Sequence, residues 1–170
     1  MSPRLTIISG GQSGVDRAAL DVAIARGIPY GGWCPEGGWA EDFSDPPGVL
    51  AHYPLLQETP SAEPAQRTAW NVRDSDACLI LVDADGLAVS QGTALTGELA
   101  VRYGKPLLVI DVSASDAATR ATTWLAALPA AHASDTPFRL AIGGPRESEA
   151  PGIYGKARRV LGEVVGRPPG

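Results

Sequence analysis

The fold class follows from "LTIISGGQSGVDRAALDVAIARG", residues 5–27. It starts with a short, continuously apolar run, Leu5–Ile8, which is typical of a strand buried on both faces. A glycine-rich turn comes next. In Val15–Arg26 the apolar residues then repeat with the period of a helix, which Gly27 is suited to end. The sequence therefore predicts a strand–turn–helix unit, the repeating element of parallel α/β sheets.

The same alternation continues along the chain. Further strands are predicted at 28–34, 77–82, 107–111 and 138–142, and further helices at 64–73, 94–103, 117–128 and 153–165. Right-handed crossovers between such units give a doubly wound, mostly parallel, Rossmann-like sheet flanked by helices. Residues 35–62 are rich in Gly, Pro, Asp and Ser, which predicts a long loop of functional or partly mobile character. We expect one ligand-binding domain over residues 1–166 and a flexible tail at 167–170.

The composition of the chain limits the kinds of partner that the protein is expected to bind. The 170 residues are 44% hydrophobic and 19% charged, with a net charge of -5 and no run of Lys or Arg. A broad basic surface for nucleic acid or an anionic membrane is therefore not expected. No stretch approaches the roughly 20 apolar residues of a membrane span, and two cysteines make no disulfide framework. These features predict a soluble, cytoplasmic protein without a zinc-type cluster. A small anionic ligand is still a candidate partner, because helix N-termini and a few placed arginines can hold one locally.

The first candidate ligand loop follows the first strand, where ligands of parallel α/β sheets bind. It comprises Gly10, Gly11, Gln12, Ser13 and Gly14. Glycines allow close backbone approach, and the free N–H groups at a helix start attract an anion. The loop lacks the lysine of a P-loop and the spacing of G-x-G-x-x-G. The alternative is a tight turn with Ser13 as N-cap, followed by Asp16 in a first turn that favours a carboxylate.

The second candidate loop follows the strand predicted at 77–82. Its ligand-binding candidates are Gly92, Thr93, Ala94 and Thr96. A glycine and hydroxyl groups again lie at a predicted helix start, although Thr93 could serve only as the N-cap. Because both loops follow parallel strands, they can converge on one crevice.

Three arginines are candidates for the positive charge that such a ligand needs. Arg67 lies on a polar face of the second predicted helix, and Arg73 ends that helix, although a solvated helix face is the alternative. Arg146 follows the last predicted strand, where its fork suits a phosphate or another oxyanion. Pairing with Glu147 or Glu149 is the alternative for Arg146.

Other polar residues have simpler interpretations. Arg17 and Asp21 are four residues apart on one predicted helix, and Glu98 and Arg102 on another, so both pairs predict surface ion pairs. Cys34 is either a buried core thiol or a soft ligand for a metal such as molybdenum. No residue is predicted to be catalytic.

Five segments, in this order, resemble one known family. They are "IISGGQSGVDRAALDVA", "GIPYGGWCPEGGWAED", "RTAWNVRDSDACLIL", "GTALTGELAVRYGKPLLVID" and "GPRESEAPGIY". The family is that of the molybdenum carriers, which includes the molybdenum cofactor carrier proteins of algae and cyanobacteria. The resemblance implies a Rossmann-like homo-oligomer, a dimer or tetramer, that binds molybdenum cofactor (molybdopterin) or molybdate, with molybdenum enzymes as candidate recipients. The chain departs from the family at Ser13, where threonine is expected, and at Gln91, where glycine is expected.

A wider resemblance raises the question of catalysis. The carrier family is similar to the Lonely-guy-type phosphoribohydrolases, whose motif P-G-G-x-G-T-x-x-E ends in a catalytic carboxylate. The matching stretch here ends at Thr96, which cannot act as a charged acid or base. The sequence therefore favours a binding protein over an enzyme. A nucleoside-monophosphate phosphoribohydrolase and a nucleotide-sensing module are the alternatives.

Overall fold

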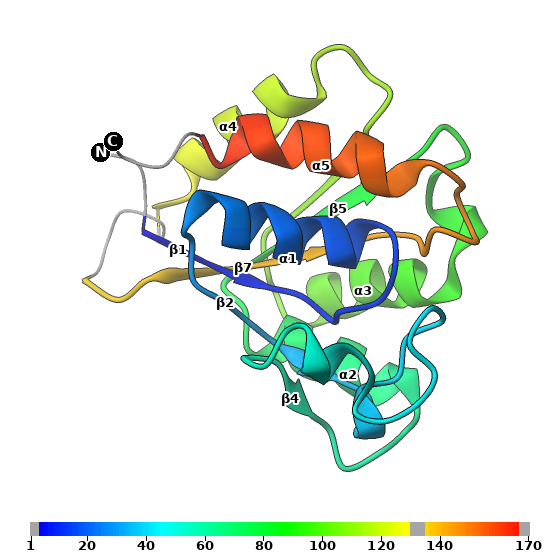
Figure 1. Ribbon diagram of the computed structural model, residues 1–170. Coiled ribbons are helices and arrows are strands. Elements are labelled where there is room, and N and C mark those ends of the chain that lie inside the picture. The colour runs from blue at the N-terminus through cyan, green and yellow to red at the C-terminus, as the bar shows by residue number, and fades with distance from the viewer. Residues whose placement is uncertain (1–3, 130–134, 167–170) are drawn as a thin grey trace.

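The computed structural model describes residues 4–129 and 135–166, so the tail predicted at 167–170 lies outside the described residues. Its centre is a five-stranded sheet in the order β2-β1-β7-β5-β6 (Figure 1). The strands are β1 (Leu5–Ile8), β2 (Tyr30–Gly31), β5 (Ala77–Val82), β6 (Leu107–Asp111) and β7 (Phe138–Gly143). Every neighbouring pair in this sheet is parallel, as the continuously apolar strands predict.

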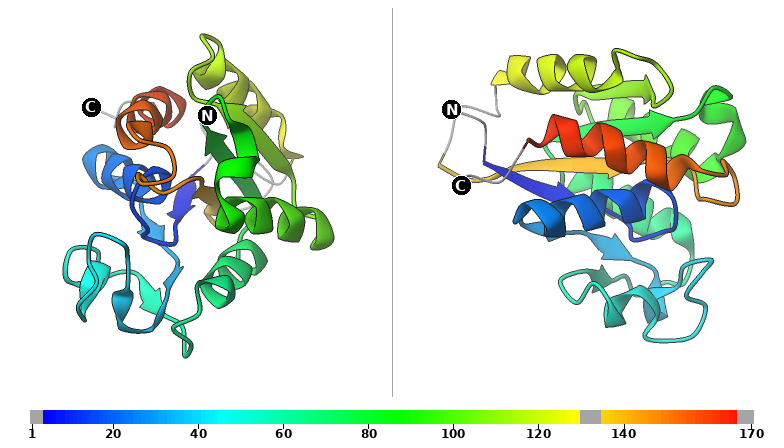
Figure 2. Two further views of the ribbon diagram at one scale, coloured as in Figure 1. Left: turned by 90° about the vertical axis from the view of Figure 1, so that its right-hand side faces the viewer. Right: turned by 45° about the horizontal axis from the view of Figure 1, so that its top comes forward.

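Helices cover both faces of the sheet (Figure 2). They are α1 (Val15–Arg26), α2 (Pro64–Arg73), α3 (Gln91–Arg102), α4 (Ala117–Ala127) and α5 (Ile153–Val164). Helices α1, α4 and α5 share one apolar core with the sheet, and α2 and α3 share a second core on the other face. Along β1, Ile7 packs into the first core and Ile8 into the second, as the alternation of a strand requires. The predicted doubly wound, Rossmann-like α/β fold is confirmed.

Strand β7 is the last strand among the described residues, yet it lies in the middle of the sheet. Its Ala141 is in register with Ile8 of β1 on one side and with Cys78 of β5 on the other. From β1 the chain continues to α1 on one face, whereas from β5 it continues through η3 (Gly86–Val89) to α3 on the opposite face. Connections that diverge in this way leave a crevice between them, beyond the carboxyl end of β7.

The predicted long loop at 35–62 is wrong. Strands β3 (Trp33–Cys34) and β4 (Gln57–Glu58) form a separate two-stranded parallel sheet, with the short turns η1 (Glu36–Gly38) and η2 (Gly48–Ala51) between them. This segment packs against Leu20 of α1 in a small apolar core, to which it contributes Cys34, Ala40, Val49, Tyr53 and Leu56. Elements this short carry no periodic pattern, which is why composition alone indicated a loop.

The strand predicted at 28–34 is two strands, β2 and β3, in two different sheets. Gly32 separates them with a φ of +129°, and a Cβ there would lie 2.2 Å from the carbonyl oxygen of Ser9. Helix α3 begins at Gln91 rather than at residue 94, because Ser90 caps it by accepting a hydrogen bond from the N–H of Thr93 at 3.2 Å. Among the helices of the described ranges, none has the length and apolar character to cross a membrane.

Candidate functional site

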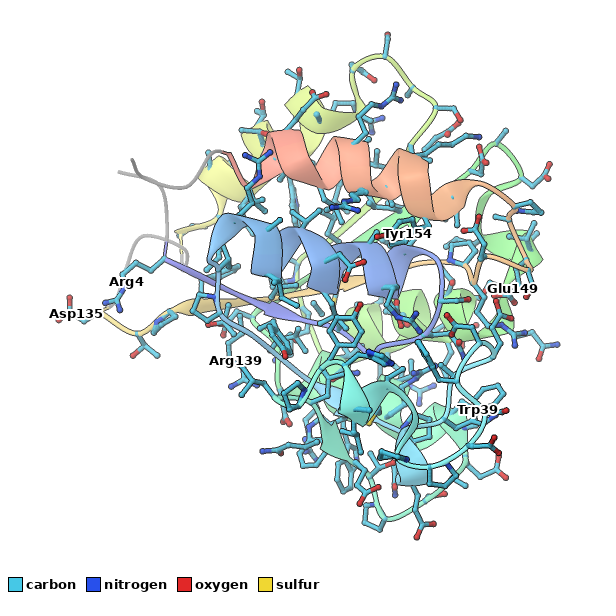
Figure 3. The ribbon with its side chains drawn as sticks, viewed as in Figure 1. Arg4, Trp39, Asp135, Arg139, Glu149 and Tyr154 are labelled. Carbon is cyan, nitrogen blue, oxygen red and sulfur yellow. The ribbon has the colours of Figure 1, made fainter. Side chains whose placement is uncertain are left out.

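A cleft of about 510 Å³ opens at the carboxyl ends of β1, β5 and β7, where the topology leaves a crevice. Seven of the predicted site residues line it: Gly10, Gln12, Arg67, Gly92, Thr93, Thr96 and Arg146. Trp39, from the segment between β3 and β4, and Glu149, from the loop after β7, also line the cleft and lie at the same end of the molecule (Figure 3). The structure thus brings the two glycine loops together around one cavity.

Gly10 gives room for two charged side chains. A Cβ at this position would lie 2.9 Å from Nη1 of Arg67 and 3.0 Å from Oδ2 of Asp16. Nη1 of Arg67 donates a hydrogen bond to the carbonyl oxygen of Gly10 at 2.8 Å. The absence of a side chain at Gly10 therefore lets an acidic and a basic group approach the end of β1 together.

Most N–H groups of the first loop are already used within the protein. The N–H of Gly11 donates to Oγ of Ser9 at 3.3 Å, that of Gln12 to Oδ2 of Asp16 at 3.4 Å, and that of Ser13 to Oε1 of Gln12 at 3.0 Å. These donors are therefore engaged, and the loop contributes mainly its shape to the cleft.

Ser13 and Gly14 connect the first loop to the segment after β7 instead of lining the cleft. A Cβ at Gly14 would lie 2.3 Å from the carbonyl oxygen of Pro145, which also accepts a hydrogen bond from Val15 N–H. Ser13 donates its hydroxyl hydrogen to Glu41 and accepts from the N–H of Glu147 at 3.1 Å. The alternative of Ser13 as N-cap is wrong, because Gly14 occupies that position without a side-chain cap.

The second loop offers backbone donors. Helix α3 starts at Gln91, so the N–H groups of Gln91 and Gly92 have no carbonyl partner within their own helix. The N–H of Ala94 donates to the carbonyl oxygen of Ser90, and Ala94 does not line the cleft. Thr96 donates its hydroxyl hydrogen to the carbonyl oxygen of Gly92 at 3.0 Å. The start of α3 is therefore the backbone part of the site that suits an anion.

Two buried charges face this helix start across the cleft. Asp16 and Arg67 are each 9% exposed, and both line the cavity. Burial raises the pKa of Asp16 to about 6, although Arg67 and the N–H of Gln12 act in the opposite direction. Burial also lowers the pKa of the Arg67 guanidinium, which nevertheless stays protonated. Sequence reasoning noted Asp16 only as a first-turn carboxylate, because its burial depends on the fold.

Arg146 lies at the mouth of the cleft, where the alternative of pairing with Glu149 is confirmed and contact with a ligand stays a prediction. Its Nε is 3.2 Å from Oε1 of Glu149, and its Nη1 is 3.7 Å from Oε2 of Glu41, while the side chain remains 39% exposed. Arg73, in contrast, does not line the cleft. It pairs with Asp74 at 2.8 Å and lies over the ring of Trp70.

Sequence reasoning missed several residues of the cleft lining. They include Ser9, Asp16, Trp39, Thr68, Ser90, Gly143, Gly144 and Glu149. The clearest available signal was "IGG" at the end of the strand predicted at 138–142, since glycines at a strand end indicate close approach. A Cβ at Gly144 would lie 2.2 Å from the carbonyl oxygen of Leu81, so the chain passes the end of β5 here with no space for a side chain.

Neither predicted surface ion pair forms. Arg17 is buried and makes two hydrogen bonds to Asp42, at 2.7 and 2.8 Å, while Asp21 accepts hydrogen bonds from two tyrosine hydroxyls. Glu98 and Arg102 are both exposed, and no ion pair within 4.0 Å joins them in the described part of the chain. Arg17 and Asp21 do not pair because the fold gives each of them another partner. An ion pair between the exposed Glu98 and Arg102 would stabilise the protein little.

Cys34 belongs to a core rather than to the cleft. It is fully buried in the small apolar cluster between β3 and β4, where burial raises the pKa of its thiol to about 11. A thiol with this pKa stays protonated at neutral pH, as expected for a buried core cysteine. In residues 4–129 and 135–166, no three His, Cys, Asp or Glu side chains are grouped to hold a metal ion.

Comparison with known proteins shows to which protein family the chain belongs. Residues 7–165 match the model of the circularly permutated YpsA SLOG family, so the chain belongs to that family. A solved structure from Syntrophus aciditrophicus SB, described as a "Putative molybdenum carrier protein", is similar at 40% sequence identity, with a TM-score of 0.82 over 98% of each chain. No curated protein matches the chain.

Proposed function

We propose that the protein binds and carries molybdenum cofactor, or a related molybdenum oxyanion, in the cleft between the two glycine loops. The observation that carries this proposal is the pairing of the α3 start with buried Arg67 across one cavity. Uncapped N–H groups and a guanidinium are the donors that bind oxyanions in proteins. The description of the Syntrophus protein as a putative molybdenum carrier supports molybdenum as the element carried.

Arg67 is well placed to meet a ligand. Within the described ranges, its one hydrogen bond is from Nη1 to the carbonyl oxygen of Gly10, so the other N–H groups of the guanidinium have no hydrogen-bond acceptor in the protein, although the charge of Asp16 acts on it. Arg146 adds positive charge at the mouth, and Trp39 adds an aromatic side chain to the lining of the same cleft. A phosphorylated pterin would therefore place its anionic end near α3 and its ring near Trp39.

The test compares two arginines, one in the cleft and one outside it. Purified protein is incubated with molybdenum cofactor or with molybdate, freed of unbound ligand by gel filtration, and assayed for retained molybdenum. We expect Arg67→Gln to lose retention and Arg73→Gln to keep it, because only Arg67 lines the cleft. Wild-type protein that retains neither ligand would exclude the carrier function.

The expected homo-oligomer, a dimer or tetramer, and delivery to molybdenum enzymes belong to the same proposal. Val101 and Tyr103, near the end of α3, are 71% and 44% exposed, and apolar side chains of this kind favour a protein contact. Analytical ultracentrifugation of wild type and Val101→Glu tests this point. A monomeric wild type, or an assembly unaffected by the substitution, would exclude this surface.

One observation favours a second candidate function, a nucleoside-monophosphate phosphoribohydrolase. Asp16 is a carboxylate in the cleft whose pKa of about 6 suits proton transfer. Against it, Thr96 stands where the related enzymes carry their carboxylate, and its hydroxyl is bonded to its own helix. Incubation with AMP and cytokinin nucleotides, followed by chromatography for free base, distinguishes the two functions. Release of base that Asp16→Asn abolishes would establish the enzyme.

A further inference from the structure

The cleft contains the buried carboxylate of Asp16, although the ligand proposed for this cleft is an anion. Asp16 lies between the ends of the neighbouring strands β1 and β7: a Cβ at Gly10 would be 3.0 Å from its Oδ2, and a Cβ at Gly143 would be 3.6 Å from its Oδ1. Both positions are glycine, so no side chain covers the carboxylate from either strand. An ionised carboxylate only accepts hydrogen bonds, so a ligand that reaches Asp16 has to donate one.

The charges that line the cleft also disfavour a fully ionised ligand. Asp16 opposes Arg67 in the buried part, and Glu149 opposes Arg146 at the mouth, so the four charges cancel when Asp16 is ionised. An oxyanion without a proton would meet the Asp16 carboxylate as a like charge, in a buried place where water screens little. A proton between the carboxylate and the oxyanion turns this repulsion into a hydrogen bond.

We propose that Asp16 is a specificity-determining residue of the cleft, which accepts a hydrogen bond from a protonated oxyanion and so selects a phosphate monoester over bare molybdate or sulfate. A phosphate monoester takes up its second proton near pH 6, whereas molybdate and sulfate carry no proton near neutral pH. The inference rests on the proposed function and identifies the part of the cofactor that enters the cleft, namely its terminal phosphate.

The surroundings of Asp16 fit a shared proton. Burial raises its pKa to about 6, close to that of a phosphate monoester. The groups that face Asp16 are Arg67 from α2, Arg17 from its own helix, and the N–H groups of Gln12 and Gly144, all of which favour the ionised form. Because these groups hold the pKa of Asp16 near that of a phosphate monoester, a proton can be shared between the Asp16 carboxylate and the ligand oxygen.

The experiment measures selectivity by isothermal titration with inorganic phosphate, molybdate and sulfate at constant ionic strength. We expect the wild type to bind phosphate at least about tenfold more tightly than the other two, the effect of one charge-assisted hydrogen bond. Asp16→Asn removes the acceptor charge, so the preference should fall by about tenfold, with molybdate and sulfate gaining affinity. Wild type that binds molybdate as tightly as phosphate would overturn the proposal.

Glu149→Gln is the matched control, because it removes one negative charge from the same cleft without touching Asp16. It should strengthen the binding of all three anions by a similar factor and leave their ratio unchanged. A change in ratio as large as that of Asp16→Asn would mean that net charge, not the position of Asp16, sets the selectivity.

A second measurement needs no variant. Binding of glycerol 3-phosphate at pH 7.5 is followed in two buffers of different ionisation enthalpy, which gives the number of protons taken up. We expect an uptake approaching one proton per site, since neither the monoester nor Asp16 holds one at that pH. Binding without proton uptake would refute the inference.

The two proposals can fail separately. If the protein retains molybdenum cofactor but does not prefer phosphate, the role of Asp16 is refuted and the carrier function is not. If the protein prefers phosphate but does not retain the cofactor, the role of Asp16 is supported and the assignment to molybdenum is refuted.

Discussion

Asp16→Asn should make the ligand-free protein more stable, because the native state buries a carboxylate that water would solvate better. The pKa of Asp16 rises from 3.8 to about 6 on folding. The folded state therefore binds this proton more tightly than the unfolded state, and stability falls as the pH rises from about 4 to about 6. At about 1.4 kcal/mol for each pKa unit, the ionised carboxylate costs about 3 kcal/mol above that window.

Urea denaturation of wild type and Asp16→Asn at pH 4 and pH 8 measures this cost. At pH 8 the variant should gain about 3 kcal/mol, or roughly 6–12 °C in melting temperature for a chain of this size. At pH 4 the two proteins should be nearly equal, since the wild-type carboxylate is then protonated. Glu98→Gln removes an exposed carboxylate and should change stability little at either pH. An Asp16→Asn variant that is no more stable than wild type at pH 8 would refute the reasoning.

Three further predictions concern the cleft and its supports. Arg67→Lys keeps the charge but loses the planar fork, so phosphate affinity measured by calorimetry should fall about tenfold, and an unchanged affinity would contradict a direct contact. Gly144→Ala brings a Cβ within 2.2 Å of a backbone oxygen of β5 and should cost about 3 kcal/mol or more in urea denaturation, whereas Gly155→Ala, with open space around it, should not destabilise. Glu41→Gln weakens hydrogen bonds from two serines, so amide exchange at residues 39–43 should accelerate, and unchanged exchange would show that these bonds do not hold the segment.

The sheet and its helices were predictable because each element carries its own periodic signal. The run Ala77–Val82 is apolar at every position, which is typical of a strand covered on both faces. The two loops at the ends of β1 and β5 were predictable from glycines at strand-to-helix junctions. Their meeting at one cleft followed from the rule that parallel strands present their carboxyl ends at one edge.

The partners of Arg17 and Asp21 were not predictable, because the fold supplies them from distant parts of the chain. Local spacing pairs Arg17 with Asp21, but in the structure Asp42 takes the guanidinium and Tyr53 and Tyr154 donate to Asp21. The burial of charged groups in the cleft has the same origin. The spacing of residues in the sequence shows which side chains are neighbours on one helix. Whether a side chain is buried depends instead on which other segments of the chain pack against it.

The position of β7 also affects how the protein is made. During synthesis β1 and β2, and separately β5 and β6, leave the ribosome before residues 138–143 have been added to the chain. Because β7 is the strand that lies between β1 and β5, one edge of each of these two strands stays unpaired until then. At roughly 5–20 residues per second, the ribosome needs several seconds to pass from β5 to β7. Exposed strand edges invite pairing with other chains during that time. We therefore expect the nascent chain to depend on chaperones until its final strand closes the sheet.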